Sequence, residues 1–234
     1  MSDFPMPYQI LSILDWVCML YFMALWVLYT LFADHSQWAR KSLTTRMNQY
    51  REMWMVQMVK RDMKMIDTTI LGNLMTGIAF FASTAMLILG GTVALLSNSS
   101  DVSQAISHLP FSTGNTTAQW EFKVLFLALI FVYAFFKFAW AFRLTNYCNI
   151  MVGSSPSPEA PWDELEKHAR RAAKVSRRSG YHFNHGLRAY FFGSAALAWF
   201  FNPVLMIAAA TLVVYVLYRR EFSSNALLAL KDDE

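Results

Sequence analysis

The sequence predicts an all-α fold, a polytopic bundle of transmembrane helices, and three observations lead to that prediction. First, 56% of the 234 residues are apolar and the mean hydropathy is +0.29, whereas soluble domains average about 45–50% apolar residues. Second, four apolar segments are each long enough to cross a bilayer core of about 30 Å as a helix. Third, lysine and arginine gather in two blocks between these segments, the pattern that encodes membrane topology. We expect one membrane domain over residues 1–234.

The first apolar segment, residues 10–32, contains a carboxylate, Asp15, close to its start. A charge near the end of a span costs less than one at the bilayer centre. Asp15 is therefore a secondary candidate for a proton or cation site. The alternative is an interfacial carboxylate that reaches the headgroups or caps a neighbouring helix. No basic n-region precedes this segment, so we expect no cleaved signal peptide.

The next stretch, residues 34–67, holds seven lysines and arginines against four acids. Tryptophan, methionine and tyrosine recur there near helical spacing, which predicts an amphipathic helix in the membrane interface. The second span, residues 70–96, is rich in glycine, alanine and serine. Small residues let helices approach closely in lipid, so we expect this helix to be central and to support self-association.

The third span, residues 121–143, carries one lysine, Lys137, within its apolar run. Hydrocarbon cannot solvate an ammonium, so the chain must supply an ion-pair partner, a water-filled cavity or a path along which the side chain reaches the membrane interface. Tyr133, Lys137 and Trp140 share one helix face. The loop before this span, residues 97–119, contains no lysine or arginine.

The second basic block, residues 144–186, continues the pattern with more lysine and arginine than acid. Pro161 is expected to open a helix that runs through about Ser179 and ends at Gly180. Its basic residues suggest binding to anionic lipid headgroups, and a solvated helix face is the alternative. Positive-inside counting places both basic blocks in the cytoplasm, with the N-terminus outside. We expect a multi-pass protein of the plasma (inner) membrane.

The last apolar region, residues 189–218, is too long for one untilted crossing. Asn202 and Pro203 near its middle are a good helix N-cap and first helical residue. We therefore favour a hairpin of two helices, residues 187–201 and 203–219, which gives five crossings and a cytoplasmic C-terminus. The alternative is a single proline-kinked helix, four crossings and an external C-terminus.

Estimates of depth along the helices place several polar residues near the inner ends of the spans. Lys137 lies deep from the outer face, and Asp67 and Asn73 lie at the inner end of the second span. A direct pair between Asp15 and Lys137 is not expected, because Asp15 lies near the outer face. The predicted binding or transport cluster has these members: Lys137, Asp67, Asn73, Arg143, Asn146, Asn184 and Arg188. Asp15, Tyr133 and Trp140 are secondary candidates.

Two classes of function fit this pattern. The first is an oligomeric pore or carrier for a small ion or polar solute, with the cluster around Lys137 as its site. The second is a non-catalytic structural or accessory membrane protein that binds lipid or a partner complex. We find no catalytic constellation in the sequence, and we expect no metal site, no cofactor and no nucleic-acid partner. His182 and His185 share a helix face, but two ligands make a poor metal site.

Five ordered motifs resemble a family of bacterial and plant membrane proteins known as the domain-of-unknown-function 599 family. They are RDMKMID at 61–67, FFAST at 80–84, AFFKF at 134–138 with Arg143 and Asn146-Tyr147, FNHGLRAY at 183–190, and YRREF at 218–222. The likeness covers roughly residues 10–225. It implies an integral membrane protein and supplies no activity, ligand or catalytic residue.

Overall fold

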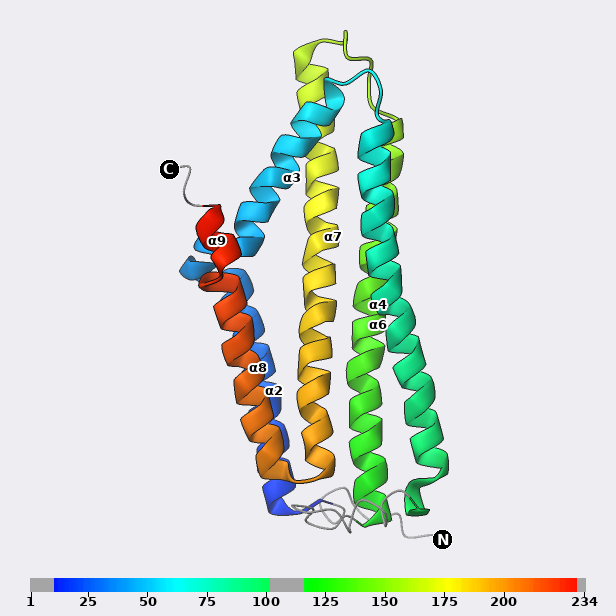
Figure 1. The fold of residues 1–234 in the computed structure, drawn as a ribbon, viewed down its shortest axis with the longest axis vertical. Coiled ribbons are helices and arrows are strands. Elements are labelled where there is room, and N and C mark those ends of the chain that lie inside the picture. Colours follow the sequence, from blue (N-terminus) through cyan, green and yellow to red (C-terminus); the bar gives the residue numbers. More distant parts are fainter. Residues whose placement is uncertain (1–10, 102–115, 231–234) are drawn as a thin grey trace.

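The computed structural model describes residues 11–101 and 116–230, which form a bundle of long helices (Figure 1). No strand occurs in these two ranges, so the predicted all-α fold is confirmed. Four segments are long and apolar enough to cross a membrane: α2, α4, α6, and α8 continued by α9. In chain order the elements are α2 (Ile13–His35), η1 (Gln37–Lys41), α3 (Leu43–Val59), α4 (Met65–Ser97), α6 (Thr117–Gly153), α7 (Trp162–Ala196), η2 (Leu197–Phe200), α8 (Pro203–Phe222) and α9 (Asn225–Ala229).

Local capping residues explain where two of the long helices begin. Ser12 and Asp15 form a capping box at the start of α2. Thr116 and Gln119 form another at the start of α6. Each box satisfies backbone N–H groups that the first helical turn leaves without a partner. The Asp15 side chain is therefore committed partly to the end of its own helix.

The predicted break at Asn202 and Pro203 is confirmed. The Asn202 side chain accepts from the backbone N–H of Val204, and Pro203 is the first residue of α8. α7 runs the length of the bundle, η2 closes its end, and α8 turns back beside α2 (Figure 1). The single kinked helix is therefore wrong. α8 brings the chain back toward α3, so the described chain ends beside α3 and far from the turn where α8 begins (Figure 1).

Two expectations about the basic segments are wrong. The helix that starts after Pro161 does not end at Gly180 but continues to Ala196; a glycine inside a helix weakens it without necessarily ending it, and Gly180 lies where Arg51 of α3 approaches α7. α3 does not lie across the bundle as an interfacial helix would; it runs obliquely alongside α7 (Figure 1). We call the end of the bundle beside α3 the basic end, and the end at the η2–α8 turn the far end.

Two apolar clusters hold the helices together. The larger one joins α2, α6, α7 and α8 around aromatic residues such as Phe22, Phe138 and Phe192. The smaller one, at the basic end, packs Met55 and Met58 of α3 against α6 and α7. α4 packs on α6 at the edge of the bundle (Figure 1), so it is not the central helix that its small residues suggested.

Candidate functional site

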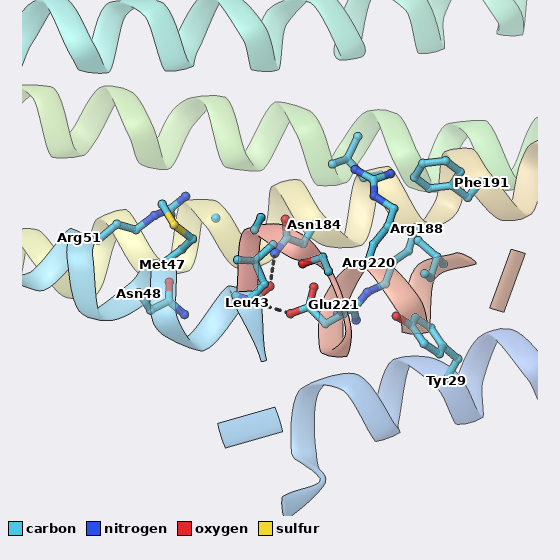
Figure 2. Close-up of a pocket in the computed structure, with 16 residues that line it drawn as sticks. Tyr29, Leu43, Met47, Asn48, Arg51, Asn184, Arg188, Phe191, Arg220 and Glu221 are labelled. Carbon is cyan, nitrogen blue, oxygen red and sulfur yellow. Dashed lines mark hydrogen bonds between the residues drawn. The ribbon is translucent and has the colours of Figure 1, made fainter. Parts of the chain in front are cut away.

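A pocket of about 400 Å³ lies where α2, α3, α7 and α8 come together (Figure 2). We call it the α7 pocket, because one face of α7 lines it from Gly180 to Phe191. Those two residues are eleven positions apart, so the pocket extends about 16 Å along the helix. It is lined by Gly180, Asn184, Leu187, Arg188 and Phe191 of α7, Tyr29 of α2, Leu43, Thr44, Met47, Asn48 and Arg51 of α3, Leu217, Arg220 and Glu221 of α8, and Ser224 and Ala226 beyond it.

The two ends of the α7 pocket differ in polarity. Asn48 and Arg51 lie at the end nearer α3, whereas Tyr29 and Phe191 lie at the opposite end, beside the apolar helices (Figure 2). The pocket is located where α2 and α8, two of the apolar helices, reach their ends. A molecule that fills it would therefore place a polar group toward the basic end and an apolar group toward the lipid.

A buried charge network lies beside the pocket, and one of its members, Arg188, lines the pocket. Arg188 Nη1 donates to Asp34 Oδ1 at 2.8 Å, and His185 Nε2 lies 2.7 Å from Asp34 Oδ2. All three side chains are largely buried. The Tyr133 hydroxyl lies 3.4 Å from His185 Nδ1 on the other side of the ring. Asp34 thus neutralises Arg188 and ties α2 to α7.

Three arginines line the α7 pocket, and they differ in how their charge is balanced. Arg188 is paired with Asp34, whereas Arg51 and Arg220 form no ion pair with the residues that the structure describes. Arg220 lies over the Phe191 ring, 5.5 Å from its centroid. Glu221, the pocket's own carboxylate, accepts a hydrogen bond from the Thr44 backbone N–H at 3.0 Å. The pocket therefore carries excess positive charge.

Arg51 is the most unusual of these groups. It reaches from α3 onto α7, where Nη1 donates to the backbone carbonyl of Ser176 at 2.8 Å. Burial lowers the pKa of its guanidinium below the usual range, although an arginine stays charged at neutral pH. A half-buried guanidinium that is bound to a neutral carbonyl has no opposite charge there to offset the cost of its desolvation.

The structure brings together only two members of the predicted cluster. Asn184 and Arg188 both line the α7 pocket, and Asn184 Nδ2 donates to Thr44 Oγ1 at 3.2 Å. Lys137 lies elsewhere, with Nζ 5.1 Å from the centroid of the Tyr133 ring. Tyr133 is the link between the two regions, because its hydroxyl approaches His185.

Lys137 and Asp67, the expected core of that cluster, do not meet. Phe81 of α4 stacks on Phe138 of α6, so these two residues mark the same height. Asp67 lies fourteen residues before Phe81, which is about 21 Å along α4 toward the basic end. The depth estimate failed because α4 starts far from the layer that contains Lys137.

The other predicted residues have separate surroundings. Asp67 is fully buried and binds Arg61 and the Trp54 indole N–H. Asn73 lines a smaller cavity between α4, α6 and α7. Arg143 donates to the Tyr147 hydroxyl at 2.5 Å and lies over the Trp140 ring. Asn146 is exposed on α6. These side chains do not line the α7 pocket.

Asp15 has a partner that the sequence did not suggest, Lys123 near the start of α6. Lys123 Nζ lies 3.7 Å from Asp15 Oδ1, and both side chains are buried. The Trp199 indole N–H donates to Asp15 Oδ1 at 2.7 Å, and its carbonyl accepts from Lys123 Nζ at 3.0 Å. The expectation that Asp15 does not pair with Lys137 is consistent with this arrangement.

Several residues in or beside the α7 pocket were missed as site candidates. Arg220 and Glu221 belong to the YRREF motif, which indicated only topology and family, and Asp34 and Arg51 were counted only as charges in a basic block. Among the described residues, no group of three or more His, Cys, Asp or Glu is placed to hold a metal ion.

Comparison with known proteins adds a family and no activity. The family model described as "Protein of unknown function, DUF599" matches residues 17–226, which is most of the chain. No curated protein and no solved structure matches the sequence.

Proposed function

The chain belongs to the DUF599 family, an assignment that names no activity, and we propose that it is a non-catalytic integral membrane protein that binds an anionic lipid in the α7 pocket. The lipid phosphate lies among the arginines, and the start of the acyl chains lies against the apolar end of the pocket. The protein would act as an accessory or structural component of the membrane rather than as an enzyme.

The observation that carries this proposal is the unbalanced positive charge in a pocket at the end of apolar helices. Arg51 and Arg220 have no ion-pair partner among the described residues, and both line the cavity. Arginine is the residue best suited to phosphate, because its planar fork donates two parallel hydrogen bonds. Basic pockets between membrane helices on the cytoplasmic side suit lipid headgroups, and positive-inside counting predicts that side for the basic end.

The shape of the pocket supports a lipid rather than a small soluble anion. Tyr29, Leu217 and Phe191 present apolar surface at the end away from α3. A free phosphate would leave that surface without a partner, whereas an amphiphile would cover it and gain about 25 cal/mol for each Å² of apolar surface buried.

The pore or carrier hypothesis has less support. It depended on Lys137, Asp67 and Asn73 meeting in one cluster, and the structure separates Lys137 from Asp67 by about 21 Å along the helices. Self-association stays a prediction, based on the small residues of α4, whose Gly72, Gly77, Gly90 and Gly91 have open space around them.

The test is lipid binding by the full-length protein in detergent, measured by native mass spectrometry. Phosphatidylglycerol is compared with zwitterionic phosphatidylcholine for the wild type, Arg220→Gln and a control, Arg170→Gln. Arg170 is also on a basic helix but is exposed and paired with Glu166 at 2.7 Å, outside the pocket. A charged hydrogen bond contributes about 1.5–3 kcal/mol, so Arg220→Gln should weaken phosphatidylglycerol binding about tenfold or more.

Two results would contradict the proposal. One is equal binding of the two lipids by the wild type, or an equal loss in Arg170→Gln and Arg220→Gln, since either means a general attraction to anionic surface. The other is full displacement of phosphatidylglycerol by millimolar inorganic phosphate, which would point to a site for the free anion.

A further inference from the structure

The arginines of the α7 pocket lie at two heights along α7, and we propose that the bound lipid carries two phosphate groups, one for each height. This inference rests on the proposed lipid binding and makes it more specific. It assigns to Arg51 the recognition of the second phosphate, and to Gly180 the positioning of Arg51.

The two heights follow from where the side chains attach. Arg188 belongs to α7 itself, and Arg220 lies over Phe191, so these two arginines mark the height nearer the lipid. Arg51 lies against Gly180 and Ser176. Gly180 is eight residues before Arg188, which is about 12 Å along the helix. One phosphate cannot bind both heights directly.

The distribution of charge distinguishes the two heights. Near the lipid, Asp34 is bound to Arg188 and Glu221 accepts from the Thr44 backbone N–H. Arg220 is therefore the guanidinium without an ion pair among the described residues at this height, and one phosphodiester would supply its partner. At the other height Arg51 rests on a backbone carbonyl, with no carboxylate bound to it among the described residues. A second phosphate would give this guanidinium the charged partner that it lacks.

Gly180 is what allows Arg51 to occupy this position. A Cβ atom at residue 180 would collide with Nη1 of Arg51 and come within 2.8 Å of its Cζ. The colliding group is the end of a flexible side chain, so an alanine would displace the guanidinium without disturbing the helix. Glycine in a helix interior lowers stability by up to about 1 kcal/mol relative to alanine. The Arg51 guanidinium occupies the space where a Cβ atom of residue 180 would lie, and this is the physical reason for a glycine here.

Arg51 also borders a second cavity of about 180 Å³ on the other side of Gly180. That cavity is lined by α4, α6 and α7, and the hydroxyls of Thr145 and Ser179 in its wall bond to each other at 2.6 Å. It offers no carboxylate among its lining residues, so it supplies Arg51 with no charged partner, whereas the α7 pocket extends from Arg51 to the apolar end at Phe191.

The experiment compares cardiolipin, which has two phosphates, with phosphatidylglycerol, which has one, on the full-length protein by native mass spectrometry. The wild type should bind cardiolipin about tenfold more tightly than phosphatidylglycerol, the gain from one further charged hydrogen bond. Arg51→Gln should reduce this preference to about twofold, the statistical advantage of a ligand with two phosphates. Affinity for phosphatidylglycerol should fall less than affinity for cardiolipin.

Gly180→Ala is the matched variant, because it keeps every charge and only displaces Arg51. It should reproduce the loss of preference seen in Arg51→Gln, with helix content and thermal unfolding like those of the wild type. Arg220→Gln should behave differently and weaken both lipids.

The inference is overturned if Arg51→Gln and Gly180→Ala keep the tenfold preference, or if they weaken both lipids equally. A wild type that binds the two lipids alike also overturns it. Failure of the proposed function itself is distinguishable, since Arg220→Gln would then leave both affinities unchanged.

Discussion

The buried pair of Lys123 and Asp15 gives the sharpest prediction about stability. Lys123 and Asp15 as whole residues are 1% and 5% exposed, and Trp199 of η2 contacts both charged groups. The pair therefore fastens α2, α6 and the turn before α8 at the far end of the bundle. Breaking it should loosen the point where the hairpin closes.

The change is Lys123→Met, which keeps the length of the side chain and removes the ammonium. The Asp15 carboxylate would then be buried with only the neutral donors of Ser12 and Trp199. Removing one partner of a buried ion pair costs about 3–5 kcal/mol. Because these two donors remain, we expect the lower part of that range, about 3 kcal/mol.

The assay is reversible unfolding of the full-length protein in mixed micelles, with the double variant Lys123→Met/Asp15→Asn. Each single change removes one charge of the pair and leaves the other charge buried, whereas the double change removes both charges. The double variant should therefore be at least about 1 kcal/mol more stable than the sum of the single effects predicts.

Lys137→Met is the matched control. Lys137 is half-buried and lies over the Tyr133 ring, a contact that contributes about 0.5–1 kcal/mol. The reasoning is refuted if Lys123→Met costs no more than Lys137→Met, or if the two single effects simply add.

Two further predictions concern α7. Gly186→Ala should destabilise the protein by about 1–3 kcal/mol, as overpacking does, because the new Cβ would lie 2.7 Å from Cζ of Phe138; thermal unfolding should show no comparable loss for Gly77→Ala, where the space is open. Burial and the nearby Lys137 lower the pKa of His182 to about 4, below the unfolded value of about 6.5. The unfolded chain then binds more protons between pH 4 and 6.5, so His182 should make stability rise with pH in that window. An NMR titration of the imidazole with a midpoint near 6.5 would contradict this.

Much of the fold could be predicted because the signals were local. An apolar segment of sufficient length predicts a membrane helix wherever it packs, and an Asn-Pro pair caps a helix with its own atoms. The turn at Asn202 and Pro203 was therefore predicted correctly. The family resemblance was likewise carried by short motifs, and the family match confirms it.

The candidate site was harder to predict because its contacts join distant parts of the chain. Lys123 was overlooked near a helix start, where lysines usually reach water, but Trp199, 76 residues away, covers it. Asp34 and Arg188 are 154 residues apart. The sequence pattern predicted a helix stop at Gly180, but the helix continues through it, and only the approach of Arg51 from α3 shows why a glycine is needed there.

The most direct test of the account is a structure of the full-length protein in nanodiscs that contain phosphatidylglycerol and cardiolipin. The account predicts phosphate density in the α7 pocket within hydrogen-bonding distance of Arg220, with acyl-chain density along Phe191. A pocket without lipid density, while lipids are resolved elsewhere around the helices, would contradict it.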